Sequence, residues 1–370
     1  MMRNHRWLIP GCILGCILLL LLLPYSLSPV RPEVWQPSSA VTLDSHYAPN
    51  NKLANYQLIC QPCGQGPEDI TFDDQGALWT GLANGDIVKL LPPYDTSQPE
   101  LIANSRGRPL GMRFDRQQRL VVADADKGLI RLEQDKSWTV LANEYEGKPL
   151  LFADHLVIAN NGDIYFSDAS TRFSYQDFIL DFIEASHTGR IFVYRATTNT
   201  LELLVDGLFF ANGVALNSDE SILYINETGR SRVLALDLAS NELSTFIDLP
   251  GMPDNLFLDD EGFLWISLIG LNDPLITQLA SYPMLRRWIG GLPRTFLKSS
   301  SNYAMTIAVD TKGNVVHNLQ ADSGYTQITT TVRTGNFLYL GSLYHNNIAT
   351  LRLPESFIKK KAPYIKCKAL

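Results

Sequence analysis

The chain has 370 residues, of which 45% are hydrophobic and 19% are charged, and its formal net charge is −7. This hydrophobic content is enough for a sizeable core and excludes a mainly disordered protein. The excess of acidic side chains argues against a nucleic-acid-binding protein.

The N-terminal segment is predicted to be a membrane anchor. Trp7–Leu27 contain 21 residues without a charge, and a helix of about 20 apolar residues spans a bilayer. Arg3 and Arg6 precede this stretch, which favours a cytoplasmic N-terminus and an exported remainder. A cleaved signal peptide is the alternative, but the stretch exceeds the usual apolar core of ~7–15 residues and no A-x-A-like site follows it. We therefore expect an uncleaved anchor over residues 1–28, with the rest in the periplasm, in a lumen or at the cell surface.

Residues 29–55 are rich in Pro, Ser and Asn and have no apolar periodicity. This composition is typical of a linker, here one that holds the next domain away from the membrane. At the other end, residues 359–370 contain five lysines and are expected to form a solvated basic tail.

Six segments between these ends share one pattern, in which a short β-rich run, a polar turn and a second β-rich run follow one another. They begin at Ile70, Met112, Leu156, Val214, Leu256 and Ile307. Their spacing fits the roughly 40–50 residues of a four-stranded blade, and Asp-x-x-Gly turns are typical of hairpins. The sequence therefore predicts an all-β fold, a six-bladed β-propeller over residues 56–358. A parallel α/β sheet is the alternative, but the helical patterns that it needs between strands are mostly missing.

Two long spacings indicate helical insertions. Residues 175–185 place Phe178, Ile179, Phe182 and Ile183 on one helix face. Residues 274–292 combine large apolar side chains with Arg286 and Arg287. Three interpretations remain open: a lid over the propeller mouth, packing on a blade edge, or contact with a membrane.

Polar residues directly before the repeats predict a metal site. The innermost strand of each blade begins beside the central channel, so four side chains are expected to converge: Glu68, Asp154, Asn212 and Asp254. Carboxylates sharing a channel raise one another's pKa unless a cation lies between them. Oxygen ligands suit Ca²⁺ best, with Mg²⁺ or Zn²⁺ as alternatives. The competing interpretation is that these side chains only cap strand starts.

Other candidate residues give weaker signals. His155 follows Asp154 and is placed for acid–base chemistry, although a packing role is favoured. Cys60 and Cys63 precede the first repeat; either one pairs with Cys367, or they pair with each other, or the thiols are free. Asn226-Glu-Thr is a glycosylation sequon. The absence of a Gly-x-Ser-x-Gly elbow and of a His-Glu-x-x-His motif removes the usual support for a serine hydrolase or a zinc protease.

Seven stretches carry a resemblance to a known family: Gly66-Pro-Glu-Asp-Ile, Gly107-Arg-Pro-Leu-Gly-Met-Arg-Phe, Val122-Ala-Asp-Ala-Asp-Lys-Gly-Leu, Ile164-Tyr-Phe-Ser-Asp-Ala-Ser-Thr, Phe210-Ala-Asn-Gly-Val-Ala-Leu, Leu249-Pro-Gly-Met-Pro-Asp-Asn and Leu340-Gly-Ser-Leu. The chain resembles the strictosidine synthase-like family, and within it the adipocyte plasma membrane-associated protein type. That family is similar in fold to paraoxonases and to gluconolactonase- and regucalcin-like propellers, whose channel holds calcium and hydrolyses lactones and esters.

The resemblance also implies roles for single residues. Glu68, Asn212 and Asp254 match calcium ligands, and Asn255 matches an additional one. The chain departs from the pattern at Ala153, where lactonases have a ligand Asn, and at Leu110, where paraoxonases have a channel histidine.

The catalytic glutamate of strictosidine synthase aligns with Arg333. A cation cannot take up and return protons as a carboxylate does. Condensation of an amine with an aldehyde is therefore not expected.

Together these features predict a membrane-anchored, calcium-dependent hydrolase of lactones or aryl esters, with a small hydrophobic ester or lactone as substrate. Asp254 is the expected base, and Asp154 is its partner or substitute. The alternative is a non-catalytic propeller that binds a small hydrophobic molecule or a protein and keeps calcium for structure.

Overall fold

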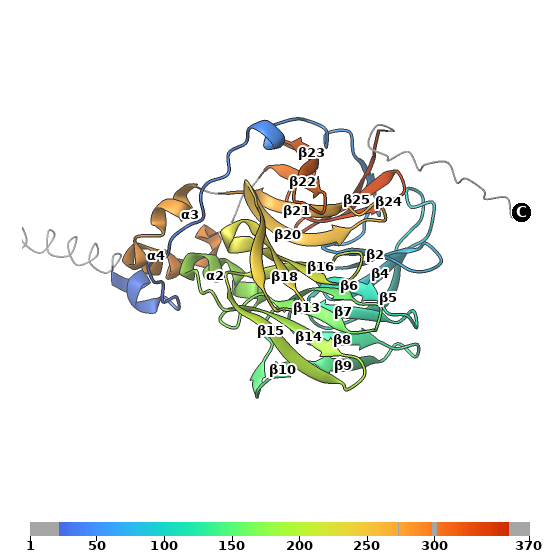
Figure 1. The fold of residues 1–370 in the computed structure, drawn as a ribbon, viewed down its shortest axis with the longest axis horizontal. Coiled ribbons are helices and arrows are strands. Elements are labelled where there is room, and N and C mark those ends of the chain that lie inside the picture. Colours follow the sequence, from blue (N-terminus) through green and yellow to red (C-terminus); the bar gives the residue numbers. More distant parts are fainter. Residues whose placement is uncertain (1–21, 273, 298–301, 355–370) are drawn as a thin grey trace, which may run out of the picture.

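The computed structural model describes residues 22–272, 274–297 and 302–354, and in these ranges the chain forms a ring of six antiparallel four-stranded sheets (Figure 1). The six-bladed propeller is thereby confirmed. None of the helices in the described ranges is long and apolar enough to cross a bilayer, and residues 7–21 of the expected anchor lie outside these ranges.

The first three blades follow one another along the chain, each from its inner to its outer strand. The first is β2 (Ile70–Phe72), β3 (Leu78–Gly81), β4 (Asp86–Leu90) and β5 (Glu100–Asn104). The second is β6 (Pro109–Phe114), β7 (Leu120–Asp124), β8 (Gly128–Leu132) and β9 (Trp138–Ala142), followed by the small hairpin β10 (Glu144–Tyr145) and β11 (Lys148–Pro149). The third is β12 (Ala153–Ile158), β13 (Ile164–Asp168), β14 (Gly189–Arg195) and β15 (Thr200–Leu208).

The remaining blades complete the ring. The fourth is β16 (Ala211–Leu216), β17 (Ile222–Glu227), β18 (Arg232–Asp237) and β19 (Leu243–Asp248), and the fifth is β20 (Gly251–Leu258), β21 (Leu264–Leu271), β22 (Ala304–Val309) and β23 (Val315–Ala321). The sixth is β24 (Ile328–Thr334), β25 (Phe337–Ser342), β26 (Ile348–Arg352) and, as its outer strand, β1 (Gln57–Ile59) from the start of the domain. The ring is therefore closed by pairing between its two ends.

One repeat assignment was wrong. The segment that begins at Ile307 forms the outer hairpin β22–β23 of the fifth blade, and the inner strand of the sixth blade is β24. Both hairpin types turn at the same end of a blade, and the Asp310–Gly313 turn has the local chemistry expected of either. The inner hairpin of the sixth blade turns through Gly335 without an Asp-x-x-Gly pattern. A search for the repeated turn therefore does not detect it.

The core lies between neighbouring blades. Ile191 and Val193 of the third blade, for example, pack with Val214 and Ile225 of the fourth, and all four are almost fully buried. Alternate residues of each strand face the adjacent sheet, as expected for sheets packed face to face.

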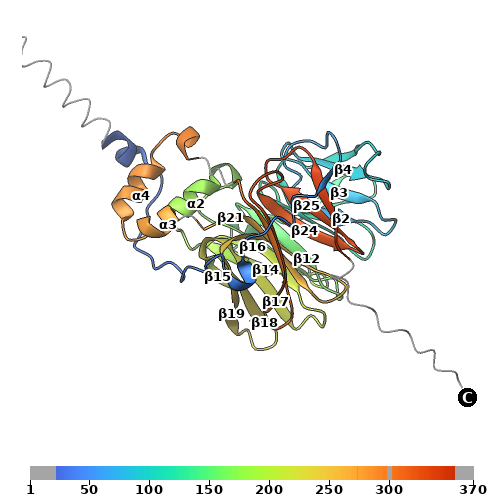
Figure 2. The same ribbon diagram turned by 90° about the horizontal axis from the view of Figure 1, so that it is seen from above.

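Both insertions are helical and lie between the second and third strands of their blades. The third-blade insertion holds a 3₁₀ turn (Tyr175–Asp177) and α2 (Phe178–Glu184). The fifth-blade insertion holds α3 (Pro274–Leu279), α4 (Pro283–Gly290) and a 3₁₀ turn (Arg294–Phe296). Further 3₁₀ turns lie at Ser45–Tyr47 and Thr228–Arg230. The α-helices of the two insertions, α2, α3 and α4, gather on one side of the ring (Figure 2), at the end where the inner strands begin.

The segment expected to be a linker packs against the domain. Val30 is fully buried beside Phe173 and Leu180, and Trp35 makes an edge contact with Phe209. The segment has no apolar periodicity because it crosses the surface in irregular conformation, with single side chains filling separate gaps. It is thus part of the folded unit rather than a free tether.

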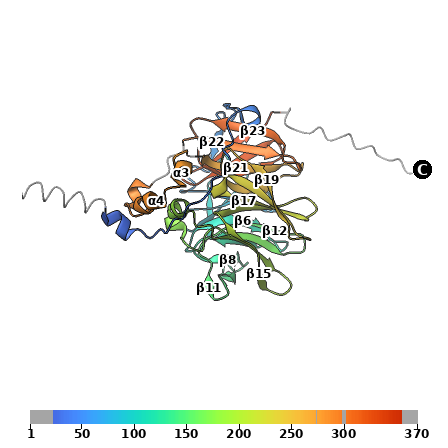
Figure 3. The same cartoon turned by 60° about the vertical axis from the view of Figure 1, so that its left-hand side comes forward.

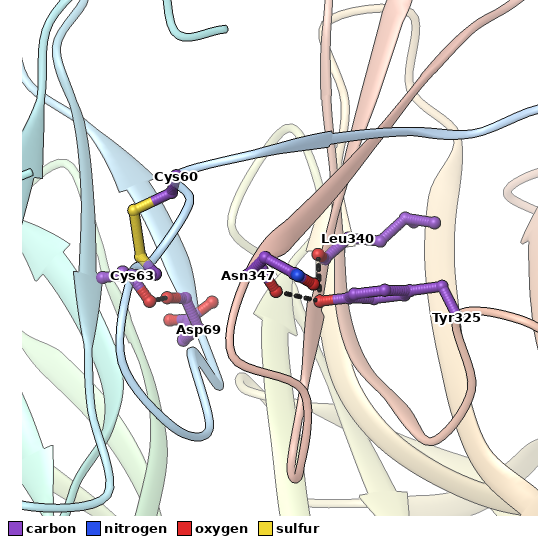
Figure 4. Close-up of a disulfide and its surroundings, with 7 residues drawn as sticks. Cys60, Cys63, Asp69, Tyr325, Leu340 and Asn347 are labelled. Carbon is purple, nitrogen blue, oxygen red and sulfur yellow. Dashed lines mark hydrogen bonds between the residues drawn. A yellow bond between two sulfur atoms is a disulfide. The ribbon is translucent and has the colours of Figure 1, made fainter. Parts of the chain in front are cut away.

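Cys60 and Cys63 form a disulfide directly after β1 (Figure 4). In the same region, the Tyr325 hydroxyl lies within hydrogen-bond distance of the carbonyls of Leu340 and Asn347 (2.9 and 2.8 Å), between which its single proton is shared. Cys367 lies outside the described residues. Of the pairings left open by the sequence, the local bridge is the one present, and it lies at the strand that closes the ring.

Candidate metal centre and its cavity

Irregularities at the starts of the inner strands position the candidate ligands. The register of β12, β16 and β20 with the next strand shifts between Ala153 and Leu156, between Ala211 and Val214 and between Pro253 and Leu256. These shifts enclose Asp154, Asn212 and the pair Asp254–Asn255. A bulge changes the direction of a side chain relative to the regular pleat, and here it allows polar residues to face the channel.

Three glycines allow the ligand-bearing backbone to come close to the neighbouring blade. A Cβ on Gly213 would meet the carbonyl oxygen of Asp254 at 2.5 Å, and one on Gly111 would meet that of Asp154 at 2.8 Å. A Cβ on Gly341 would meet the carbonyl oxygen of Glu68 at 2.6 Å. A side chain at any of these positions would displace a candidate ligand.

Hydrogen bonds from neighbouring strands fix the same backbone. Asn226 and Thr228 donate from the fourth blade to the carbonyls of Asp254 and Pro253 (2.5 and 2.7 Å). Thr329 of β24 donates to the carbonyl of Glu68 (2.6 Å). The ligand positions are therefore set before any ion binds.

The three carboxylates meet at the channel mouth. One carboxylate oxygen from each of Glu68, Asp154 and Asp254 lies within 4.8 Å of the others, and all three residues are buried. They come from the first, third and fifth blades. The convergence expected from the sequence is present, including Asn212 from the fourth blade, whose side chain hydrogen-bonds Asp254.

Unsatisfied oxygens at this site fit a hard cation. Among the described residues, Glu68 Oε2, Asn212 Oδ1 and Asn255 Oδ1 are buried without a hydrogen-bond partner, while Asn255 Nδ2 donates to Glu68 Oε1 (3.2 Å). Buried acceptors without a donor are costly. An all-oxygen set of carboxylates and amides is the donor chemistry of Ca²⁺ sites. The residues present therefore fit the predicted ion.

The pKa values of the three carboxylates in the metal-free site also indicate a site suited to a cation. Burial, and then the charges of Asp254 and Asp154, raise the pKa of Glu68 well above its usual range. Burial, followed by the charge of Asp254, has the same effect on the pKa of Asp154. Burial raises the pKa of Asp254 to about 7, although the hydrogen bond from Asn212 opposes the shift. Without a cation, three ionised carboxylates at this separation repel one another strongly.

Arg108 places a positive charge beside the carboxylates. Its buried guanidinium donates to the carbonyl of Gly66 (3.0 Å) and lies 5.3 Å from the centre of the Tyr175 ring. Its charge lowers the pKa values of Glu68, Asp154 and Asp254, against the larger effect of burial. Arg108 thereby links the metal site to the third-blade insertion.

A cavity of about 540 Å³ lies over the carboxylates. Its floor is polar, whereas its walls are apolar and largely aromatic, formed by Phe152, Tyr175, Phe178, Phe182, Phe210, Ile269, Leu279, Ile289 and Phe296. Side chains from both insertions take part in the wall. Of the three interpretations of the insertions, the lid over the channel mouth is the one that this lining supports.

Comparison with known proteins places the chain in a family. The family pattern for strictosidine synthase matches residues 154–236, and that for the N-terminal part of strictosidine synthase-like proteins matches residues 46–90. Strictosidine synthase-like protein 4 of Arabidopsis thaliana is 30% identical over 368 residues, covering 97% of this chain and 98% of the relative. The chain belongs to the strictosidine synthase-like family. The adipocyte plasma membrane-associated protein of Salmo salar is 29% identical, covering 92% of this chain and 89% of its own.

Proteins of known structure share the fold of this family member. A gluconolactonase from Xanthomonas campestris superposes with a TM-score of 0.59 at 17% identity, covering 88% of this chain and 97% of its own. Regucalcin from Agrobacterium tumefaciens, a calcium-binding protein, gives 0.57 at 14% identity, covering 80% and 93%. At these identities the likeness shows the common fold alone.

Arg333 does not occupy the cavity. It lies near the end of β24, away from the cavity side where Gln327 precedes that strand, and pairs with Asp259 (2.9 Å) and Glu261 (2.6 Å) in the β20–β21 turn. The prediction that Arg333 stands at the position of the catalytic glutamate is therefore wrong, because alignment to the following strand does not tell which residues of β24 lie near the cavity. Arg333 is a buried ion-pair partner at the far end of the blades.

Two other sequence candidates also have structural roles. His155 is fully buried, accepts a hydrogen bond from the Val214 amide at Nδ1 (3.0 Å), and lies with Nε2 3.0 Å from Arg113. Burial lowers its pKa to about 3, so it stays neutral and joins two inner strands. The side-chain amide of Asn226 is buried and donates to Asp254, as described above, and is therefore closed to glycosylation in the folded chain.

The sequence does not predict the place of Arg108 or of the wall residues Phe152, Phe210 and Phe296. Arg108 lies in the Gly107-Arg-Pro stretch directly before a repeat, where the flanking residues are apolar. Phe152 and Phe210 stand one position before Ala153 and Ala211. Their position next to the polar starts of the inner strands is the feature of the sequence that could have predicted their place in the cavity wall. Leu110, noted as replacing a histidine, lines the cavity as an apolar side chain.

Proposed function

We propose that the protein is a calcium-dependent hydrolase of lactones or aryl esters, acting at the floor of the cavity. The observation that carries this proposal is the set of three buried carboxylates at the polar base of a pocket whose walls are otherwise apolar. A pocket with a polar floor and apolar walls orients a hydrophobic substrate with its polar group toward the carboxylates. The fold shared with a gluconolactonase and with calcium-binding regucalcin supports the same reaction class.

Glu68, Asn212, Asp254 and Asn255 would hold the ion, with Asp154 beside them. When bound, the cation supplies charge that polarises the carbonyl oxygen of the substrate. The aromatic side chains Phe152, Phe182 and Phe210 pack against the ester or lactone and exclude water from its apolar part.

Asp254 is the proposed base, with Asp154 as its partner or substitute. Its carboxylate lies with those of Glu68 and Asp154 at the cavity floor, where a bound carbonyl group and an attacking water would meet. It takes a proton from the attacking water as the new carbon–oxygen bond forms, and it returns the proton to the alkoxide or phenoxide when the ester bond breaks. The products are a carboxylic acid and an alcohol or phenol, or one hydroxy acid from a lactone.

The proposal also places this domain on the exported side of a membrane, held by a single anchor at residues 7–27. The uncharged stretch and the preceding arginines support the anchor. The Cys60–Cys63 disulfide supports an oxidising compartment. Relatives that bear the name plasma membrane-associated protein are similar to nearly the whole chain.

Hydrolysis of phenyl acetate and of simple lactones by the purified full chain, with Ca²⁺ or with EDTA, tests the function. We expect EDTA to abolish turnover, and Asp254→Asn to lower kcat at least 100-fold, since a general base contributes typically 10²–10⁴-fold. Asp260→Asn, an exposed residue in the turn after β20, is the matched control and should leave kcat unchanged.

Turnover that survives both EDTA and Asp254→Asn would reject the mechanism. Calcium-dependent stabilisation without turnover on a broad ester panel would instead support the non-catalytic binding propeller.

A further inference from the structure

Exposed apolar side chains of the fifth-blade insertion lie beside the cavity. Tyr282, Met284 and Phe296 of the fifth-blade insertion are 62%, 70% and 76% exposed, and Leu285 is also exposed. We call these four residues the roof patch. Phe296 lines the cavity as well, so the patch adjoins the cavity mouth.

The end of the predicted anchor lies against the same helix. The guanidinium of Arg287 in α4 lies 4.6 Å from the centre of the Tyr25 ring, and Gly291 packs directly on the backbone of Pro24. Figures 1 and 3 show the helical residues 22–27 beside α4. Residues 22–27 belong to the uncharged stretch that ends at Leu27, and Leu22, Leu23 and Leu27 are exposed.

The segment after the anchor makes hydrogen bonds to α2 and α4. The buried guanidinium of Arg286 donates to the carbonyls of Ile183 and Glu184 in α2 (both 3.2 Å) and to that of Glu33. The amide of Arg31 donates to Glu184 Oε2 (2.7 Å). These contacts hold the segment after the anchor on α2 and α4, so the roof patch lies close to the point where the chain would leave the bilayer.

We propose that the roof patch docks on the surface of the lipid bilayer in which the anchor is inserted, so that the cavity opens toward the lipid phase. This inference rests on the anchoring in the proposed function. Because the uncharged stretch continues to residues that touch α4, the bilayer surface lies beside α4 once that stretch is inserted. Arg287 in α4 adds a positive charge beside the patch, which suits anionic headgroups around an inserted apolar face.

Lipid photocrosslinking tests the docking in the full chain. The protein is reconstituted into phosphatidylcholine–phosphatidylserine vesicles containing a lipid with a diazirine in its acyl chain, irradiated, digested and analysed by mass spectrometry. We expect lipid adducts on residues 282–289 and 294–297 at least tenfold above those on Val140 and Leu243, which are exposed apolar residues on blade edges.

A pair of variants provides the control. Met284→Asp combined with Leu285→Asp, neither of which lines the cavity, should reduce roof adducts at least tenfold and leave adducts on residues 7–27 and phenyl acetate hydrolysis unchanged. Val140→Asp combined with Leu243→Asp should change none of these.

The outcomes separate the proposals. Adducts on residues 7–27 with none on the roof, or crosslinks that join the roofs of two protein copies, overturn the docking and leave the anchor intact. Failure of the protein to float with the vesicles overturns both anchoring and docking. Absence of hydrolysis with strong roof adducts overturns only the hydrolase.

Discussion

The charges at the cavity floor balance a divalent ion. Glu68, Asp154 and Asp254 contribute three negative charges when ionised, and the buried Arg108 contributes one positive charge. The net charge of the ionised cluster is thus −2, which a single Ca²⁺ neutralises. Arg108 therefore has an electrostatic role in addition to its contact with Tyr175.

Replacing Arg108 should change the preference of the site for ion charge. In Arg108→Met the cluster would carry three negative charges and favour a trivalent ion. At an effective dielectric constant of about 20, a unit charge ~7 Å away contributes about 2 kcal/mol per unit of ion charge. We expect the affinity ratio of Tb³⁺ to Ca²⁺ to rise roughly 30-fold, since every 1.4 kcal/mol is a factor of ten, as measured by terbium luminescence with calcium competition. Arg106→Met, at an exposed position two residues earlier, is the control, and an equal change in both variants would contradict this role.

At the scale of elements, the sequence predicts the strand starts better than the blade boundaries. Glu68, Asp154, Asn212 and Asp254 were found because each directly precedes an inner hairpin with a recognisable turn. The sixth blade was misassigned because a hairpin turn reports only that two strands are adjacent, not which pair of the blade they form. The composition of residues 29–55 predicts a linker for a related reason, since contacts made by single side chains leave no period in the sequence.

Because the inner strands of neighbouring blades approach closely, the absence of a side chain at Gly213 is as important for calcium binding as the ligands themselves. In Gly213→Ala the new Cβ would lie 2.5 Å from the carbonyl oxygen of Asp254 and 2.6 Å from the Leu256 amide, so the start of β20 must move. We expect a loss of about 1–3 kcal/mol in the free energy of unfolding and a calcium affinity at least tenfold weaker, measured by isothermal titration calorimetry.

Gly262→Ala separates the loss of stability from the displacement of Asp254. Gly262 has a φ of +80° in the β20–β21 turn, with open space around its Cβ position, so alanine there destabilises the fold by backbone strain. Calcium affinity should stay at the wild-type value. Equal weakening of calcium binding in both variants would show that general loss of stability, not displacement of Asp254, is the cause.

Across the whole molecule, the candidate ligands join the first, third, fourth and fifth blades around one point, so the state of the site affects the stability of the ring. The raised pKa values of Glu68, Asp154 and Asp254 mean that the metal-free folded state holds protons that the unfolded chain releases. Stability of the metal-free protein should therefore fall as pH rises from about 4, the unfolded value, through about 7, the folded value for Asp254.

In the proposed site, calcium would bind the ionised carboxylates, so its stabilising effect should grow over the same pH range. At a free concentration 100 times Kd, an ion that binds only the folded state adds about 2.7 kcal/mol, which corresponds to a rise of several degrees in Tm. Differential scanning calorimetry with Ca²⁺ or EDTA at pH 5, 6, 7 and 8 measures this rise. We expect it to be largest at pH 8, nearly absent at pH 5, and smaller at every pH in Asp254→Asn. A rise in Tm that is the same at pH 5 and pH 8 would mean that calcium binds outside the carboxylate cluster, because only a site with these raised pKa values couples ion binding to proton release in this range.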